Sequence, residues 1–278
     1  MIAKSLRIHS VGAMCAFSTD GARTIDLTKK GVDEPSDDPT AMEAAPRGFF
    51  SLFPGLDRRV VTLPINFSTP FMREYIMGMR CVNSDKETFR STLAKNGSKG
   101  NALVVVVGGA AESMLVKPGC IELVLEHRRG FVREAIRAGA SIVPSLAFGE
   151  TDLYYVTEEE EGSLISKIQE WVKKVTGVAM PLFRGRGILL VDFGMMPLRK
   201  PIVVVVGAPI APPKLEDGVT FDPIVDRSTQ EPQNEHGKLL CEWHEKYVTA
   251  LTELYDAYKD KEWNRPGKNR KQSMVIVK

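Results

Sequence analysis

The fold is decided by one stretch, Gly100-Asn101-Ala102-Leu103-Val104-Val105-Val106-Val107-Gly108-Gly109. Its continuous apolar run, residues 103–107, is as long as a strand and carries no polar side chain. A strand with one face in water would alternate apolar and polar residues, so this run predicts a strand buried on both faces. A second run of the same kind, residues 202–206, predicts another. We expect both to be central strands of one sheet.

Outward from this stretch, apolar β-branched runs alternate with helical patterns. Such alternation is typical of βαβ units, in which helices cover both faces of a parallel sheet. The sequence therefore predicts an α/β fold with a mostly parallel central sheet flanked by helices. The further strands expected are 60–63 and 141–146, and the helices are 71–79, 130–138, 164–175 and 240–258.

Length and composition are those of an ordinary globular protein. The chain has 278 residues, is 43% hydrophobic and has a net charge of +2. We expect a single domain over residues 1–278, because this length can bury a sizeable core. The proline- and acid-rich residues 31–47 predict a mobile loop, and residues 264–278 predict a basic tail that frays. So small a net charge gives no reason to expect a nucleic-acid partner.

The remaining composition excludes several other classes of site. The four cysteines are scattered, which indicates neither a zinc site nor a disulfide framework, and so a reducing compartment fits. The chain has no run of about 18 apolar residues that would predict a membrane-spanning helix. Its first residues predict no signal peptide. P-loop, G-x-S-x-G and dinucleotide-binding patterns are absent, which argues against a nucleotide cofactor.

A glycine pair follows the first valine run. Gly108 and Gly109 come where the strand should end, and Glu112 and Ser113 lie just beyond. Ligands in α/β sheets bind at the carboxyl ends of strands, and glycine lets the backbone approach them closely. This position predicts a binding site. A tight turn followed by an acid in the first turn of a helix would have the same pattern, and the sequence leaves both interpretations open.

A stripe of arginines marks the helix expected over residues 130–138. Arg129, Arg133 and Arg137 are spaced four apart, opposite an apolar face that includes Phe131. Guanidinium groups are well shaped to bind phosphates, but the stripe could equally be a solvated face. Gly139 is expected to end the helix in the left-handed conformation.

None of the four histidines has the partners of a metal site or a hydrolase triad. They are His9, His127, His236 and His244. A lone histidine is more often structural than catalytic, and the pattern does not select a general base.

The blocks around the glycine pair resemble the type 2 diacylglycerol acyltransferase family, which includes monoacylglycerol and wax-ester acyltransferases. The resemblance covers residues 10–261, nearly the whole chain. The matching blocks are Phe17-Ser18-Thr19, Phe53-Pro54-Gly55, Arg73-Glu74-Tyr75, residues 100–113, Arg129-Gly130-Phe131-Val132 with Ala135, Val143-Pro144, Phe148-Gly149-Glu150, Gly185-Arg186-Gly187, Phe193-Gly194, Pro197, residues 199–202 and 206–210, His244 and Tyr247.

This resemblance implies an acyl-CoA-dependent O-acyltransferase of glycerolipid-acyltransferase-like fold. The expected reaction transfers a fatty acyl group from acyl-CoA to diacylglycerol, giving triacylglycerol at the endoplasmic reticulum membrane. It implies no metal and no cofactor, since acyl-CoA is a co-substrate, and it is compatible with a homo-oligomer. Glu112 is the expected catalytic residue, orienting a donor to the oxyanion. The expected substrate-binding residues are Gly108, Gly109, Ser113, Arg128, Arg129, Gly130, Phe131, Arg133, Pro144, Glu150 and His244.

The sequence departs from the family pattern at one place. Family members carry a His-Pro-His-Gly motif just before the segment matched by residues 10–17, and its histidine is the presumed general base. Here that place reads Leu6-Arg7-Ile8-His9, and the hydrophobic hairpin that precedes the motif in the family is not in the chain. We therefore expect a member incomplete at its N-terminus. The alternative is a membrane-associated fragment that binds lipid or a partner without catalysis.

Overall fold

Secondary structure is well placed over a large part of the chain. The computed structural model describes residues 13–18, 56–68, 70–93, 100–108, 120–150, 153–156, 183–185, 197–198, 203–215, 220–226, 229–263 and 273–277. The elements are β1 (Ala13–Ser18), β2 (Leu56–Thr62), η1 (Pro64–Phe67), α2 (Met72–Gly78), β3 (Cys81–Asn83), α3 (Lys86–Leu93), β4 (Gly100–Val106), β5 (Cys120–Val124), α5 (Gly130–Ala138), β6 (Ser141–Phe148), β7 (Tyr155–Val156), β8 (Phe183–Arg184), β9 (Val203–Val206), α7 (Glu235–Trp263) and β10 (Ser273–Val277).

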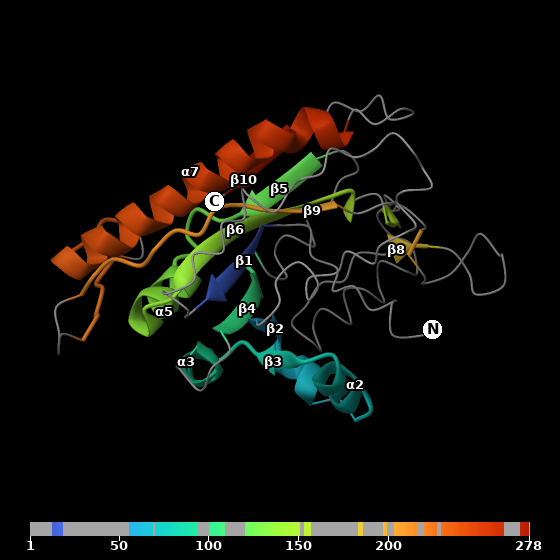
Figure 1. The fold of residues 1–278 in the computed structure, drawn as a ribbon, viewed down its shortest axis with the longest axis horizontal. Helices are drawn as coiled ribbons and strands as arrows, with labels where there is room; N and C mark the ends of the chain where they lie inside the picture. The colour runs from blue at the N-terminus through green and yellow to red at the C-terminus, as the bar shows by residue number, and fades with distance from the viewer. Residues whose placement is uncertain are drawn as a thin grey trace, which may run out of the picture.

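The main sheet has six strands in the order β3-β2-β4-β1-β6-β9. β2 pairs in parallel with β3 and with β4, whereas β1 runs antiparallel to both β4 and β6, and β9 runs antiparallel to β6. The fold is therefore mixed α/β, and the expectation of a mostly parallel sheet is wrong for three of the five strand pairs. Two of these pairs arise because β1 inserts in the reverse direction between β4 and β6, which point the same way, and the third arises because β9 runs in reverse at the edge of the sheet (Figure 1).

The two valine runs occupy different positions in the sheet. Residues 100–106 form the inner strand β4, in which Leu103 is fully buried, as predicted. The second run forms β9, which lies at the edge of the sheet, and the side chain of Val204 is 48% exposed. The prediction of a buried central strand is wrong there, because a valine run reports β propensity and not the number of neighbouring strands.

The helices expected at 71–79, 130–138 and 240–258 are confirmed as α2, α5 and α7. α5 ends in a Schellman motif: Gly139 has φ 62°, and the Ala140 N–H donates to the Ala135 carbonyl. α7 begins after Asn234, whose side-chain oxygen accepts the Gly237 N–H at 2.7 Å as an N-cap does. The helix expected at 164–175 and the loop expected at 31–47 lie outside the described residues.

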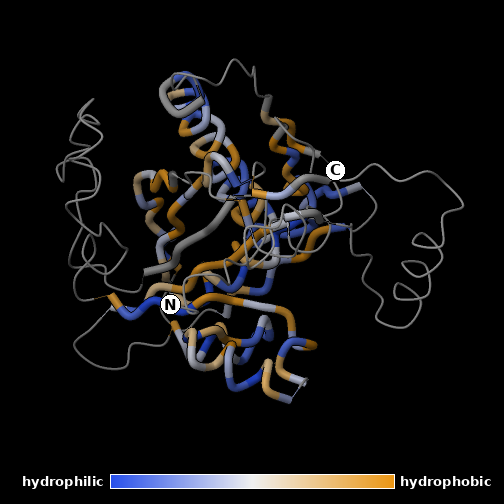
Figure 2. The backbone as a smooth tube through the Cα atoms, turned by 90° about the vertical axis from the view of Figure 1, so that its right-hand side faces the viewer, coloured by the Kyte–Doolittle hydropathy of each residue, from blue (hydrophilic) through white to orange (hydrophobic). Residues whose placement is uncertain are grey.

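The core lies where the sheet, α5 and α7 meet. Its fully buried members include Leu103, Val132 and Tyr247, and the rings of Phe148 and Tyr255 stack with centroids 6.2 Å apart. α7 crosses one end of the molecule above β6, while α2 and α3 lie at the other end beside β3 (Figure 1). Figure 2 shows hydrophobic stretches gathered in the middle between these helices.

The end of the chain is more ordered than its composition predicts. Residues 273–277 form β10, which pairs in parallel with β5 from Ser273↔Cys120 to Val277↔Val124. Fraying is therefore wrong for this segment. Its alternating apolar residues, Met274 and Ile276, pack against the core, and this burial stabilises a strand that the flanking lysines and prolines obscure in the sequence.

Candidate active site

One edge of the main sheet gathers the ends of four strands. The register places Thr62 beside Asn83, and Met14 beside both Val106 and Ser145. Because β2, β3, β4 and β6 point the same way, their carboxyl ends share this edge. β1 runs in reverse, so its first residue, Ala13, lies at the same edge. We call it the carboxyl edge, the position at which α/β sheets bind ligands.

Gly108, the first residue of the glycine pair, lies at this edge. It is buried and comes two positions after Val106, the last residue of β4, close to where the sequence predicts the strand to end. Gly109, Glu112 and Ser113 lie outside the described residues, so the roles expected of them stay predictions. Glu150 is half-buried just beyond β6, and its backbone carbonyl accepts the Leu153 N–H at 3.2 Å. Gly108 and Glu150 therefore both lie at the carboxyl edge, beyond the ends of β4 and β6.

The start of α5 lies against α7. α5 ends two residues before β6 begins and packs against that strand. Arg128 is exposed in the loop before α5, and Arg129 is its N-cap. Phe131, one residue inside the helix, is buried, with its ring edge against Tyr247 at a centroid distance of 5.2 Å. Phe131 therefore anchors α5 on α7.

The arginine stripe makes contacts within the protein. Arg129 Nη1 donates to the Gln230 carbonyl at 3.0 Å and to Cys241 Sγ at 3.3 Å, so it ties α5 to the loop before α7 and to α7 itself. Arg137 Nε donates to the Phe221 carbonyl at 3.0 Å. All three arginines of the stripe are half-buried, which differs from the solvated face considered above. Whether Arg129 and Arg133 also bind phosphate stays a prediction.

Glu134 is a buried acid that the sequence analysis missed. Its side chain is 5% exposed and accepts from Arg133 Nε and Arg137 Nη1 at 3.2 Å each, and from Arg90 Nε at 3.4 Å. The spacing of Glu134 and Arg137 was the available signal, because residues three apart are neighbours on a helix. Arg90 comes from α3, so Glu134 fastens α3 to α5 and fixes the direction of the arginine side chains.

His244 is held inside the protein as a neutral ring. It is 6% exposed, and its Nε2 lies 3.1 Å from the Leu125 carbonyl, to which it donates. Burial and the nearby charge of Arg129 lower the pKa of His244 from 6.5 to about 4. A ring with this pKa and an engaged Nε2 is a structural element under the start of α5. The substrate-binding role expected for His244 stays a prediction.

Pro144 lies within the sheet, where β6 pairs with β1. Its carbonyl accepts the Gly207 N–H at 2.8 Å, and a Cβ at Gly207 would come within 3.0 Å of its ring. Proline has no N–H for a ladder bond and is normally confined to edge strands, strand starts and bulges, so Pro144 is an exception within an inner strand. Its position indicates that Pro144 shapes the join between β6 and the segment after β9.

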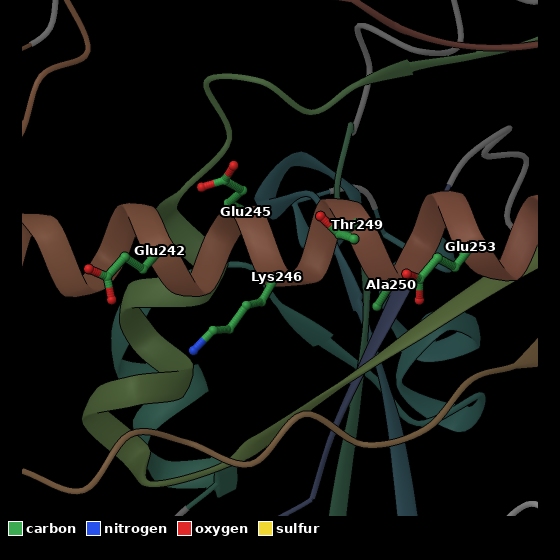
Figure 3. Close-up of a pocket in the computed structure, with 6 residues that line it drawn as sticks. All are labelled: Glu242, Glu245, Lys246, Thr249, Ala250 and Glu253. Atoms are coloured by element: carbon green, nitrogen blue, oxygen red, sulfur yellow. The ribbon is translucent and has the colours of Figure 1, made fainter.

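A surface hollow of about 440 Å³ follows the solvent side of α7 (Figure 3). Its lining residues all come from this helix: Glu242, Glu245, Lys246, Thr249, Ala250 and Glu253. Three carboxylates against one ammonium group have the wrong sign of charge for the phosphates of CoA. This hollow therefore does not compete with the carboxyl edge as an acyl-CoA site.

In the part of the chain that the structure describes, no group of three or more metal-binding side chains is placed to hold an ion. No helix in that part is both long enough and apolar enough to cross a bilayer.

A family profile described as "Diacylglycerol acyltransferase" matches residues 40–268, a range that includes the glycine pair, α5 and the whole of α7. The chain belongs to the diacylglycerol acyltransferase family. The resemblance read from the sequence motifs is thereby confirmed. No solved structure matches the chain.

Curated members of the family align with most of the chain. It is 36% identical over 253 residues to "Diacylglycerol O-acyltransferase 2A" of Umbelopsis ramanniana, which covers 91% of the chain and 60% of that protein. It is 40% identical over 212 residues to "Diacylglycerol O-acyltransferase 1" of Schizosaccharomyces pombe, covering 76% of the chain and 56% of that protein. It is 36% identical over 255 residues to "Diacylglycerol O-acyltransferase 2" of Bos taurus, covering 91% and 59%. The chain thus spans about 60% of the length of these relatives.

Proposed function

We propose that the chain is an acyl-CoA-dependent O-acyltransferase that converts diacylglycerol to triacylglycerol at the endoplasmic reticulum membrane. The observation that carries this proposal is the family match over residues 40–268, together with relatives named as diacylglycerol O-acyltransferases. The reaction needs a base for the acceptor hydroxyl, donors for the tetrahedral oxyanion and a cationic surface for CoA. It needs no metal and no redox cofactor.

We assign the oxyanion to the carboxyl edge and the CoA phosphates to the start of α5. Glu112, four positions after Gly108, is assigned to orienting an oxyanion donor. Arg128 is an exposed cation just before α5, and we assign it to a CoA phosphate. The family's histidine motif precedes the segment that becomes β1, and β1 begins at this edge. A general base located just before β1 would therefore lie at the carboxyl edge, as Gly108 does.

The acyl transfer balances without a co-reactant. The acceptor oxygen loses its proton to the base and bonds to the thioester carbonyl carbon, giving a tetrahedral oxyanion. Collapse of this intermediate breaks the C–S bond, and CoA leaves as a thiol after taking up the proton. Donors near the glycine pair would stabilise the oxyanion, and each such donor is typically worth about 100- to 1000-fold in rate.

A second candidate function is binding of acyl-CoA and lipid without transfer. The observation that favours it is the reading Leu6-Arg7-Ile8-His9 where family members carry His-Pro-His-Gly. Loss of a general base costs about 100- to 10,000-fold in rate, which would leave binding intact.

The test is triacylglycerol formation from labelled acyl-CoA and diacylglycerol by membranes that contain the chain. Transfer that falls at least 100-fold in Glu112→Gln supports the acyltransferase. If transfer also disappears in His9→Ala, His9 acts as the base. Acyl-CoA binding with no product above membranes lacking the chain would support the second candidate. The absence of both binding and product would contradict both proposals.

A further inference from the structure

Exposed large hydrophobic side chains gather on one short segment between β2 and β3. Five of the eight in the described residues lie within residues 63–77. The most exposed are Phe71 at 89% and Met77 at 54%. We call the set the apolar ridge; it consists of Leu63, Ile65, Phe71, Met72 and Met77. Exposed apolar side chains that gather on one segment mark an interaction site more often than exposed residues scattered singly.

Neither packing nor backbone conformation accounts for the phenylalanine at position 71. Its side chain contributes little to the core, and its φ of 65° lies in the left-handed region, where a bulky residue is strained and glycine is favoured. A fold that needed only the turn before α2 would be better served by glycine. The large apolar side chain therefore points to a use outside the folded core.

The apolar ridge adjoins the carboxyl edge. Leu63 directly follows Thr62, the last residue of β2, and Thr62 lies level with Asn83 of β3. In Figure 1, η1 and α2 form the end of the molecule opposite α7, and the tube in Figure 2 has hydrophobic stretches there. A partner that covered the ridge would thus lie beside the sheet edge at which the candidate site is built.

The charges around the ridge indicate the kind of partner. Arg73 is exposed in the first turn of α2, directly after Phe71 and Met72, and has no ion pair within the described ranges. Arg80, just beyond the far end of α2, is paired with Asp57 through Nη1. Glu74 is the exposed carboxylate on α2 itself. Aromatic and methionine side chains with a free arginine beside them suit a bilayer surface, where apolar groups enter the acyl boundary and cations meet lipid phosphates.

We propose that the apolar ridge docks the protein on a phospholipid surface, which brings the carboxyl edge next to the lipid phase. The proposal rests on the proposed function in one respect: diacylglycerol is dissolved in that phase and must enter the site from it. Leu63 lies at the end of the ridge nearest this edge, and Arg73 contacts the headgroups. A second copy of the chain is the competing occupant.

The test is co-sedimentation of the full chain with phosphatidylcholine vesicles, with and without phosphatidylserine. Phe71→Gly is the central variant, because it removes the ring and relieves the strained backbone, so that it should fold at least as well as the parent chain. Met77→Asp is the second variant. Ile224→Asp is the matched control, since Ile224 is 49% exposed but lies outside the ridge.

Each ridge variant should lower the vesicle partition coefficient about tenfold or more, as expected for the loss of one inserted side chain. The control should bind like the parent chain. Arg73→Gln should weaken binding to the phosphatidylserine vesicles more than to the neutral ones, and the difference should shrink in high salt.

Two results would overturn the proposal. One is equal vesicle binding by the parent chain and both ridge variants. The other is a change in sedimentation velocity with no change in vesicle binding, which would assign the ridge to contacts between copies of the chain. The assay uses no acyl-CoA, so it tests docking separately from acyl transfer. Ridge-dependent vesicle binding without triacylglycerol synthesis would support the docking proposal and contradict the proposed function. Triacylglycerol synthesis by a chain whose vesicle binding does not depend on the ridge would support the proposed function and contradict the docking proposal.

Discussion

The imidazole of His244 donates its Nε2 proton to the carbonyl oxygen of Leu125, 3.1 Å away and 119 positions earlier in the chain. The bond joins α7 to the turn that leads from β5 to α5. It requires the ring to be protonated at Nε2, because a carbonyl oxygen only accepts. The same ring lies beside Phe131, with centroids 6.3 Å apart, so α7 supports the start of α5 by both a polar and an aromatic contact.

The buried ring makes stability depend on pH in acid. The pKa of His244 is about 4 in the folded protein and near 6.5 in the unfolded chain. Between these values the unfolded chain binds a proton that the folded protein does not. The contribution is therefore complete above pH 6.5 and is lost as the pH falls from 6.5 to 4, by on the order of 3 kcal/mol. Urea denaturation at pH 7 and pH 5 measures this slope.

His244→Gln should remove this part of the slope, because a glutamine amide can donate to Leu125 and does not titrate. A comparison variant is His127→Gln, which should keep most of the slope, because the charge of His127 is the smallest of the causes that lower the pKa of His244. A slope that persists in His244→Gln would assign the acid sensitivity to other groups.

The Glu134 carboxylate should be worth more than an ordinary surface ion pair. Glu134→Gln removes the negative charge that three guanidinium groups share in a nearly buried position. We expect the free energy of unfolding to fall by about 2–3 kcal/mol, since hydrogen bonds to charged groups are the strong ones. Urea unfolding at neutral pH measures it.

Glu235→Gln is the control for Glu134. Glu235 also pairs with a residue three positions along its helix, Lys238, but its side chain is 85% exposed. Exposed pairs of this kind contribute little to stability, so Glu235→Gln should leave the free energy of unfolding almost unchanged. Losses of equal size in the two variants would show that the partners of Glu134 are screened by water in solution.

Local signals in the sequence predicted the helices better than the sheet. α5 was predictable to the residue, because its apolar face and the glycine that ends it lie within ten positions. The place of β1 was not, since its partners, Val104 and Val143, lie about 90 and 130 positions further along the chain. The edge position of β9 and the pairing of β10 with β5 depend on such distant contacts too. Glu134 was missed for the same reason, because Arg90 reaches it from another helix.

A methyl group at Gly237 should destabilise the start of α7. A Cβ built there would come within 2.4 Å of the Ile224 carbonyl oxygen and 3.0 Å of Asn234 Oδ1. Gly237→Ala should lower the free energy of unfolding by about 1–3 kcal/mol, although alanine is the better helix former. The control is Gly78→Ala in α2, where a Cβ meets nothing within 4 Å, and which should be neutral or slightly stabilising. A neutral Gly237→Ala would show that the loop at Ile224 moves aside without cost.

The start of α5 holds two arginines whose replacement should have separable effects. Arg128 is exposed, whereas Arg129 donates to the Gln230 carbonyl and to Cys241. If the start of α5 binds CoA, Arg128→Ala should raise the KM for acyl-CoA about tenfold, the value of one charge-assisted hydrogen bond to phosphate. The effect should shrink at high salt, and the acceptor KM and the urea midpoint should barely move.

Arg129→Ala should mainly lower the urea midpoint, because it frees the Gln230 loop from α5. Lys246→Ala, an exposed cation on α7, is the control for acyl-CoA binding. An unchanged acyl-CoA KM in Arg128→Ala would move the CoA site away from α5 and leave these arginines with their structural contacts alone.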